Sequence, residues 1–547
     1  MNKYIKTTLA VGFATIALTA CEDLDTEPKG RYITEESKKE TLEVNPQMAD
    51  AGIAGMAATV NQFGAIAGTD THNDFGYASV MLGSECQGQD MVNAYIGYNW
   101  FRNWSCWTSP TPSGYPTTYA WYNFYKQIFA SNSVLNSIDA DTENPDLQFY
   151  RAQACMTRAF DYWNLAQYYQ FNYKGHENSP CLPIVTNENA LEVEQKGAPR
   201  ATVQEVYDQI LKDATEAIDL LTASGKSPEQ MTTSKPKRFG SLATAYGMRA
   251  RVYLTMHKYA EAAADAASAI QNFDGAPLSL AAAYRPGFVD IASSNWMWGI
   301  PVNESDRVVT TGICNWPSMA NTLISNTYAE VGAWRSINVA LYNYIPKTDV
   351  RKGWWLDENL HSDMLNKEEA AFIAAKGGDI DPYTNVKFGP YQGVVGNTTH
   401  AEDIPLMRIE EMYYIQAEGL AMSGNVNEGV LALTNFVKTY RDPNYAFMAN
   451  SAEDVQNEVW MQRRVEFWGE GVSWFDLMRL DKPVVRTGTN WDTSSSFNIP
   501  ASTGNMDHAK IRIYCIPQGE INGNKALSES DNNPSGVRPS PATWTEY

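Results

Sequence analysis

Two stretches of equal length decide the fold because they share one pattern of small and larger apolar residues. Residues 250–269 read ARVYLTMHKYAEAAADAASA, and residues 417–436 read AEGLAMSGNVNEGVLALTNF. The matching positions, offset by 167 residues, are Ala250, Tyr253, Tyr259, Ala262, Ala266 and Ala269 in the first stretch and Ala417, Leu420, Val426, Gly429, Leu433 and Phe436 in the second. Spacings of three and four residues are typical of α-helices. The sequence therefore predicts two helix pairs of one kind.

This spacing is typical of the tetratricopeptide unit, in which small residues let two helices approach and larger side chains fill the gap between units. A weaker third copy joins helices expected at 148–170 and 203–222. Its second-helix positions are Tyr207, Ile210, Ala214 and Ala217. Because such units bury their faces only against one another, we expect the copies to stack into one superhelix. Ordinary helix-hairpin packing remains the alternative.

The helical period continues along most of the chain. Further helices are expected near 45–60, 119–139, 321–345, 405–423, 452–470 and 473–480. Expected strands are few and short, at 182–185, 297–302, 386–389 and 511–516, and the long stretches 68–118, 272–320 and 376–402 are expected to be loops. The predicted fold class is therefore mostly α, a tetratricopeptide-repeat helical superhelix packed against a loop-rich region with few short strands. We expect one domain over residues 45–547, with helix pairs near 148–222, 239–271 and 405–440.

Composition excludes several classes of protein. Of 547 residues, 44% are hydrophobic and 19% are charged, which is typical of a globular chain. Asp and Glu outnumber Lys and Arg by 63 to 42, a net charge of −21. Nucleic-acid binding requires a basic surface, so we expect no nucleic-acid partner.

The N-terminus predicts export and anchoring. Residues 1–20 combine Lys3 and Lys6 with a short apolar run, as secretory signals do. The run ends in Leu-Thr-Ala followed by Cys21, which is similar to a bacterial lipobox, in which the signal is cut before a cysteine that is then lipidated. A plain secretory signal with a chance cysteine is the alternative. Residues 21–44 are polar and are expected to form the lipidated cysteine and a flexible tether.

The remaining six cysteines are too few for a disulfide scaffold in a chain of this length. A bond between Cys86 and Cys106 could close a loop, but the sequence alone does not establish it. We expect most of these residues to be buried free thiols.

Catalytic motifs are missing. The chain contains no Gly-x-Ser-x-Gly elbow and no His-Glu-x-x-His zinc helix, and its six histidines never occur at ligand spacing. We therefore expect no enzyme activity, no cofactor and no metal site. A pair of carboxylates for glycoside cleavage remains a possible exception in a chain with 63 acidic residues.

An aromatic cluster between residues 95 and 125 gives the candidate binding residues. Trp100, Trp104 and Trp107 lie where Ser, Pro, Gly and Asn interrupt any helical period, so we expect them in a loop. Exposed tryptophans can form a platform for the apolar face of a sugar, and Asn103 could bond to its hydroxyls. Trp316 and Asp74, in other expected loops, complete the candidate set. The alternative is that these tryptophans attach a long loop to the helical body, and that Asp74 only caps a helix.

Several segments, in order, resemble the SusD/RagB family of Bacteroidetes outer-membrane nutrient-binding lipoproteins. They are Cys21 with the acidic residues after it, AQACMTRAFDYWNLAQYY at 152–169 with LPIV at 182–185, DIPLMR at 403–408, RRVEFWGEG at 463–471 with WFDLMR at 474–479, and IPQ at 516–518. The ordered set spans nearly the whole chain. It agrees with the helix-pair register found above.

The resemblance implies a function. Such proteins bind a nutrient glycan at the cell surface and hand it, without catalysis, to a SusC-like TonB-dependent transporter. The implied localisation is the outer membrane, with a lipid anchor at Cys21 and exposure on the cell surface. No fixed ligand motif carries over from the family. Ligand residues are expected in the loop-rich part, which favours Trp100, Asn103 and Trp104.

Two other functions stay open. The same scaffold could capture peptides, or a repeat scaffold could only organise a surface complex. The charged segment from Arg463 to Arg479 is expected to be structural, with Glu466 pairing with Arg464 and Asp476 capping the turn near Gly471.

Overall fold

The computed structural model describes residues 35–64, 66, 71–93, 98–105, 111–170, 172–486, 490 and 513–534. The expected signal, Cys21, Cys106 and Trp107 lie outside these residues. Within the described part, no helix is both long and apolar enough to cross a membrane. The five described cysteines are all free and buried, as expected from the sequence.

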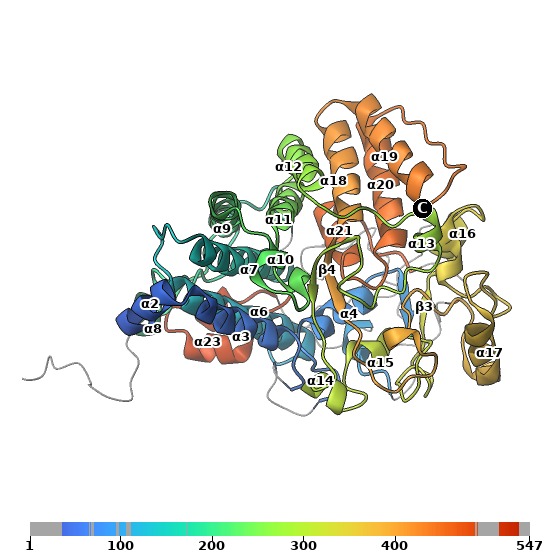
Figure 1. Cartoon of the computed structure of the whole chain (residues 1–547), viewed down its shortest axis with the longest axis horizontal. Helices are drawn as coiled ribbons and strands as arrows, with labels where there is room; N and C mark the ends of the chain where they lie inside the picture. The colour runs from blue at the N-terminus through green and yellow to red at the C-terminus, as the bar shows by residue number, and fades with distance from the viewer. Residues whose placement is uncertain are drawn as a thin grey trace, which may run out of the picture.

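Paired long helices form one side of the molecule (Figure 1). Their bounds are α6 (Tyr115–Ser137), α7 (Pro145–Tyr169), α9 (Val203–Ser224), α11 (Leu242–Thr255), α12 (Tyr259–Gln271), α18 (Ile409–Met422), α19 (Val426–Tyr440) and α20 (Ala452–Glu466). Helix α7 packs on α6 and α9, α12 packs on α11 and α18, and α18 packs on α19 and α20. The pairs predicted near 239–271 and 405–440 are therefore neighbours in space, although 137 residues separate α12 from α18.

Glycines allow the closest helix approaches. A Cβ atom on Gly429 would lie 2.7 Å from the Ala417 carbonyl oxygen, and one on Gly419 would lie 2.6 Å from the Tyr259 carbonyl oxygen. The first contact joins the two helices of one pair, and the second joins neighbouring pairs. Real Cβ atoms do not approach other atoms so closely, so any larger residue would push these helices apart.

The N-terminal end of the described chain is helical, so the expected flexible tether at 21–44 is wrong for residues 35–44. Helix α2 (Glu35–Val44) packs on α6, and α3 (Ala49–Val60) packs on α6 and α7. The sequence of α2, EESKKETLEV, is too polar to show an apolar face. Arg238 forms an ion pair with Asp50 at 2.9 Å and fixes α3 to the segment before α11.

Shorter elements connect the long helices and make up the loop-rich part. They are α4 (Tyr77–Gln87), α5 (Arg102–Ser105), α8 (Ala190–Lys196), α10 (Pro228–Met231), α13 (Leu280–Tyr284), α14 (Arg307–Thr310), α15 (Trp316–Ala320), α16 (Val339–Tyr344), α17 (Lys367–Lys376), α21 (Ser473–Arg479) and α23 (Gln518–Gly523). Strands β1 (Met91–Asn93) and β3 (Arg335–Ile337) pair antiparallel, as do β2 (Trp296–Ile300) and β4 (Ile404–Arg408). The fold is thus mostly helical with few short strands, as predicted.

Several predicted elements are wrong. The segment 321–345, expected to be one helix, contains loop, strand β3 and the short helix α16. Most of the expected strands form no ladder. Residues 182–185 and 513–516 are irregular, and 386–389 contains only a bridge from Phe388 to Gly287. The expected loop 68–118 contains helix α4, all eleven of whose residues are buried. A helix buried on every side shows no apolar stripe, so periodicity does not reveal it.

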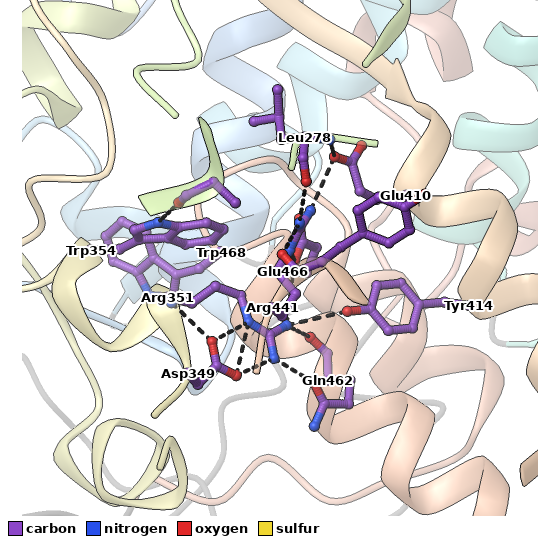
Figure 2. A network of polar contacts seen from close by, with 12 residues as sticks. Leu278, Asp349, Arg351, Trp354, Glu410, Tyr414, Arg441, Gln462, Glu466 and Trp468 are labelled. Atoms are coloured by element: carbon purple, nitrogen blue, oxygen red, sulfur yellow. Dashed lines mark hydrogen bonds and ion pairs between the residues drawn. The ribbon is translucent and has the colours of Figure 1, made fainter. Parts of the chain in front are cut away.

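A buried network of ions joins the helices to the loop-rich part (Figure 2). Arg441 Nε bonds to Glu466 at 2.8 Å, and Arg441 Nη2 bonds to Glu410 at 3.0 Å. Arg408 and Arg351 also reach Glu466, at 3.0 and 3.3 Å. The three arginines hold the pKa of Glu466 far below its usual value despite burial.

The segment from Arg463 to Arg479 is structural, but its expected pairings are wrong. Arg464 does not pair with Glu466; it reaches Asp90 at 2.6 Å, across 374 residues of sequence. Asp476 does not cap a turn, because its two oxygens bond to Arg463 at 2.7 Å and Arg479 at 2.8 Å. Helix periodicity suggests partners on the same helix, as for Asp476 and Arg479 within α21, whereas Arg463 and Arg464 are buried and pair with acids on other elements.

Candidate functional site

Four rings from three segments gather at the surface of the loop-rich part. We call His72, Tyr98, Trp100 and Tyr328 the aromatic platform. The ring centres of Trp100 and His72 are 4.8 Å apart, those of Trp100 and Tyr328 are 6.3 Å apart, and those of Tyr98 and Tyr328 are 6.4 Å apart. Tyr98 is 58% exposed, His72 and Trp100 are half-buried, and Tyr328 is buried beneath them. The platform therefore has an accessible aromatic surface with a fixed base.

Buried polar side chains hold the Trp100 side of the platform. Asn73 donates to the Trp100 carbonyl oxygen at 3.0 Å and accepts from the Tyr119 hydroxyl at 2.9 Å. Asn99, between Tyr98 and Trp100, accepts from buried Arg335 of β3 at 3.1 Å. The short segment 98–101 is thus bonded to α6 and to β3. Such bonds orient the rings before any ligand arrives.

Tyr328 is fixed from below. Its backbone nitrogen donates to both the carbonyl and the hydroxyl oxygen of Ser318 in α15, each at 3.1 Å, and its own hydroxyl bonds to His72 Nδ1. Burial raises the pKa of Tyr328, so its hydroxyl remains neutral at physiological pH. The ring contacts and this hydrogen bond join residues 72 and 328 into one surface.

The structure buries three of the candidate residues. Trp104 is 2% exposed and packs between Phe101 and Tyr119, with ring centres 5.2 and 5.8 Å away. Trp316 is 3% exposed and lies edge-on to Phe388 at 4.5 Å. The expectation that both rings stand exposed in loops is wrong, because short helices α5 and α15 turn them into the core.

Asp74 is also internal. It is fully buried, and both of its carboxylate oxygens accept from the Ile66 backbone nitrogen, at 3.1 and 3.2 Å. It therefore bonds to the backbone of residue 66 and does not face solvent. Trp100 is half-buried and Asn103, in α5, is also half-buried, so both remain candidates. Trp107 lies outside the described residues.

Sequence reasoning missed Tyr328, because residues 321–345 were expected to be helical. The run Ser325-Asn326-Thr327 was a signal against that helix, since consecutive residues of these types favour turns. Asn326 adopts a positive φ of 60°, as a loop asparagine can. Tyr98 and His72 lie within the expected loop 68–118 but are not among the residues that the sequence predicts as a site.

Two buried acids have strongly shifted pKa values but do not form a catalytic pair. Burial raises the pKa of Glu402 to about 8 and that of Glu85 to about 8, with Asp90 adding to the shift of Glu85. Glu402 accepts from the Tyr391 nitrogen at 3.2 Å, and Glu85 accepts from the Gly471 nitrogen at 2.8 Å. Each is almost fully shielded from solvent, so neither can meet a polymeric substrate.

One group of side chains has the composition of a metal site. The ligand atoms of Cys155, Asp213 and Glu216 lie within 4.8 Å of one another. However, Asp213 bonds to Arg158 at 2.6 Å and Glu216 bonds to Arg151 at 2.9 Å. Burial also keeps the pKa of the Cys155 thiol well above its usual value. The two arginines already balance the charge of the carboxylates, so this group links α7 to α9 rather than offering a cation site.

Comparison with known proteins places the chain in a family. Residues 39–254 match the family model described as "Starch-binding associating with outer membrane", and residues 375–535 match that described as "SusD family". The two matched ranges flank the platform residue Tyr328, and the first contains the other three. The chain belongs to the SusD/RagB family.

Individual relatives are distant in sequence. SusD-like protein P38 of Formosa agariphila is 21% identical over 410 residues, which cover 68% of this chain and 74% of that protein. A SusD-like protein of Bacteroides ovatus is 23% identical over 390 residues, 66% of this chain, and the match spans only 64% of the relative. A solved SusD-like carbohydrate-binding protein from Bacteroides vulgatus has a TM-score of 0.68 at 22% identity, covering 89% of this chain and 98% of that one. This last likeness establishes the shared fold.

Proposed function

We propose that the protein is a lipid-anchored protein of the outer-membrane surface that binds a neutral glycan on the aromatic platform and passes it, without catalysis, to a SusC-like TonB-dependent transporter. The main support for this proposal is the aromatic platform. Its rings His72, Tyr98 and Trp100 stay accessible in part, and the buried Tyr328 forms its base. Sugar rings present apolar faces of C–H groups, which pack on aromatic rings, while their hydroxyls need polar partners at the edge. The family description, which names starch binding and the outer membrane, supports both ligand class and location.

The charge of the chain supports a neutral ligand. A net charge of −21 disfavours sulfated or uronic-acid-rich polysaccharides, because the surface repels anions. Asn103 in α5, shortly after the platform segment, has a side-chain amide that can bond to the hydroxyls of an uncharged ligand. Water competes for each of these hydrogen bonds, so we expect micromolar to millimolar affinity.

Calorimetric titration tests the binding step. The chain beginning after Cys21 is titrated with starch, xylan, mannan and β-glucan, beside Trp100→Ala and the matched control Phe447→Ala. Phe447 is also half-buried but lies in the connection after α19. Binding that Trp100→Ala weakens and that Phe447→Ala leaves unchanged supports the proposal. Binding of oligopeptides but of no polysaccharide would contradict it and favour peptide capture.

The partner needs a separate experiment. The tagged full chain is purified from detergent-solubilised outer membranes, and the proteins that accompany it are identified by mass spectrometry. A TonB-dependent β-barrel transporter in about equal amount is the expected result. Recovery of the chain alone would contradict the transfer step but would leave glycan binding intact.

A further inference from the structure

Helices α6, α8 and α23 lie on the helical side of the molecule (Figure 1). Their side chains line a hollow. Its volume is about 570 Å³, and its lining includes Tyr122, Tyr125, Pro183, Glu194 and Asn524. We call it the α6 groove. Small-molecule sites in proteins commonly measure ~300–1,000 Å³, so the groove has the size of a ligand site. None of the four platform residues lines it.

The groove is built from segments far apart in sequence that are bonded to one another. Tyr125 of α6 donates to the Pro183 carbonyl oxygen at 2.7 Å. Asn524 donates to the Ala198 carbonyl oxygen at 2.9 Å and accepts from the Ala198 nitrogen at 3.1 Å. A Cβ on Gly197, where φ is 77°, would lie 2.4 Å from Asn524 Oδ1, so only glycine allows this contact. The walls are therefore preformed.

One face of α6 carries a line of aromatic rings into the groove and past it. Tyr115, Tyr122 and Phe129 are spaced by seven residues, so they lie on nearly the same side of the helix and about 10 Å apart along its axis. Tyr115 is 38% exposed, Phe129 is 76% exposed, and Tyr122 is half-buried in the groove lining. Exposed phenylalanine on a helix surface has no structural benefit by itself, whereas a row of rings is suited to a flat, partly apolar ligand.

Polar groups around Tyr122 have balanced charge. Lys126 and Lys525 face the groove together with Glu194 and Glu520. The Tyr122 hydroxyl has no hydrogen-bond partner among the described residues, and burial together with the charge of Glu520 raises its pKa. The lining thus combines aromatic surface with several donors and acceptors and no net charge. This chemistry fits a neutral polyhydroxylated ligand and gives no advantage to an anion or a cation.

We propose that the α6 groove is a second carbohydrate site, which binds a segment of neutral oligosaccharide with sugar rings on Tyr122 and Phe129. A bound peptide strand would require a row of unpaired backbone groups, but α6 and α8 pair theirs within the helix. The inference rests on glycan binding as the proposed function and extends it, because a chain with two sites holds one polysaccharide at two points. Two linked sites bind a polymer more tightly than either site alone.

Stoichiometry distinguishes the groove from the platform. The polysaccharide bound by the wild-type chain is cut to short oligosaccharides, and these are titrated into wild type, Tyr122→Ala, Phe129→Ala, Trp100→Ala and the control Phe447→Ala. We expect two oligosaccharides per wild-type chain and one per chain for Tyr122→Ala and for Trp100→Ala. Affinity for the intact polysaccharide should fall about tenfold or more in either variant, because avidity is lost. Tyr122→Phe, which keeps the ring, should retain the second site with weaker binding.

Each other outcome is decisive. One oligosaccharide per wild-type chain, lost with Trp100→Ala and unaffected by Tyr122→Ala, would overturn the groove and leave the proposed function. Binding that depends on Tyr122 but not on Trp100 would support the groove and overturn the platform. Binding of oligopeptides that depends on Tyr122, with no sugar binding, would overturn the carbohydrate assignment of both sites. Absence of all polysaccharide binding by wild type would overturn both proposals.

Discussion

The indole ring of Trp100 lies 4.8 Å from the imidazole ring of His72, centre to centre, at an interplanar angle of 30°. The two rings come from segments on either side of helix α4 and make one tilted surface, with the Tyr328 hydroxyl bonded to the histidine from below. Both rings are half-buried, so part of each side chain stays accessible. This pair is the smallest unit of the proposed platform.

Replacement of Trp100 by alanine should weaken glycan binding and leave the fold intact. Loss of a stacking face is expected to cost about 1–2 kcal/mol, which raises the dissociation constant about 5- to 30-fold. His72→Ala should weaken binding less, because its ring contributes mainly by supporting Trp100. Titration calorimetry measures both effects, and unchanged far-ultraviolet circular dichroism is the control. Undiminished affinity in Trp100→Ala would exclude the platform as the binding site.

Replacement of Trp104 should have the opposite pattern. Its ring is 2% exposed and lies so close to Gly83 that a Cβ there would come within 2.5 Å of it. Trp104→Ala leaves a large cavity and should lower the free energy of unfolding by about 3–5 kcal/mol. Denaturant titration measures this loss. The affinity per folded molecule should equal that of wild type, and a weaker affinity would show that Trp104 takes part in binding after all.

Stability should depend on pH through Glu402. Its pKa is raised from 4.5 to about 8 in the folded protein, because burial disfavours the charged form. The neutral acid contributes its full stability below pH 4.5 and loses it as the pH rises to about 8, since the unfolded chain releases its proton first. Wild type should therefore lose on the order of 3 kcal/mol relative to Glu402→Gln between pH 5 and pH 9.

The measurement is the difference in free energy of unfolding between Glu402→Gln and wild type across this range. Glu428→Gln, at an exposed position on α19, is the matched control and should follow wild type at every pH. A difference that stays constant from pH 5 to pH 9 would mean that Glu402 is already charged in the folded protein.

Loss of one charge from the buried network should be costly. Arg441 is fully buried and bonds to both Glu410 and Glu466, so Arg441→Met leaves two carboxylates with fewer partners. A loss of about 3–5 kcal/mol in the free energy of unfolding is expected, as measured by denaturant titration. Lys196→Met, which removes an exposed ion pair with Glu192, should change stability by about 1 kcal/mol or less. Similar losses in the two variants would contradict this view of the network.

The proposed anchor is tested by Cys21→Ser. Without the thiol no lipid can be attached, so the variant should partition into the aqueous phase of a detergent phase separation, while the native chain enters the detergent phase. Mass spectrometry of the native N-terminus should show acyl chains on Cys21. Aqueous partitioning of both forms would support a plain secretory signal instead.

The sequence predicted the helix pairs better than the site. Ala417 and Gly429 indicated close helix approach, and they lie at such a contact, because spacing along a helix translates directly into one face. The same reasoning could not separate Trp100 from Trp104. The two residues are four positions apart in the chain, but Trp100 is partly exposed to solvent and Trp104 packs on Tyr119. Only the direction of the short helix α5 decides which of the two rings is buried. Tyr328 joins His72 across 256 residues, a contact that no local pattern reveals.

The buried network also sets how the chain can be divided. Its charges come from residues 349–351, 408–410, 441 and 466, and the bond from Arg351 to Glu466 joins the loop-rich part to the long helices. A shortened version that ends between Arg351 and Glu466 would keep the buried Arg351 but lose Glu466, one of its two acidic partners. Neither this N-terminal fragment nor the remaining C-terminal fragment should be soluble when produced alone. A folded protein should form only when the two fragments are produced together. The smallest part of the chain that can fold by itself is therefore nearly the whole chain.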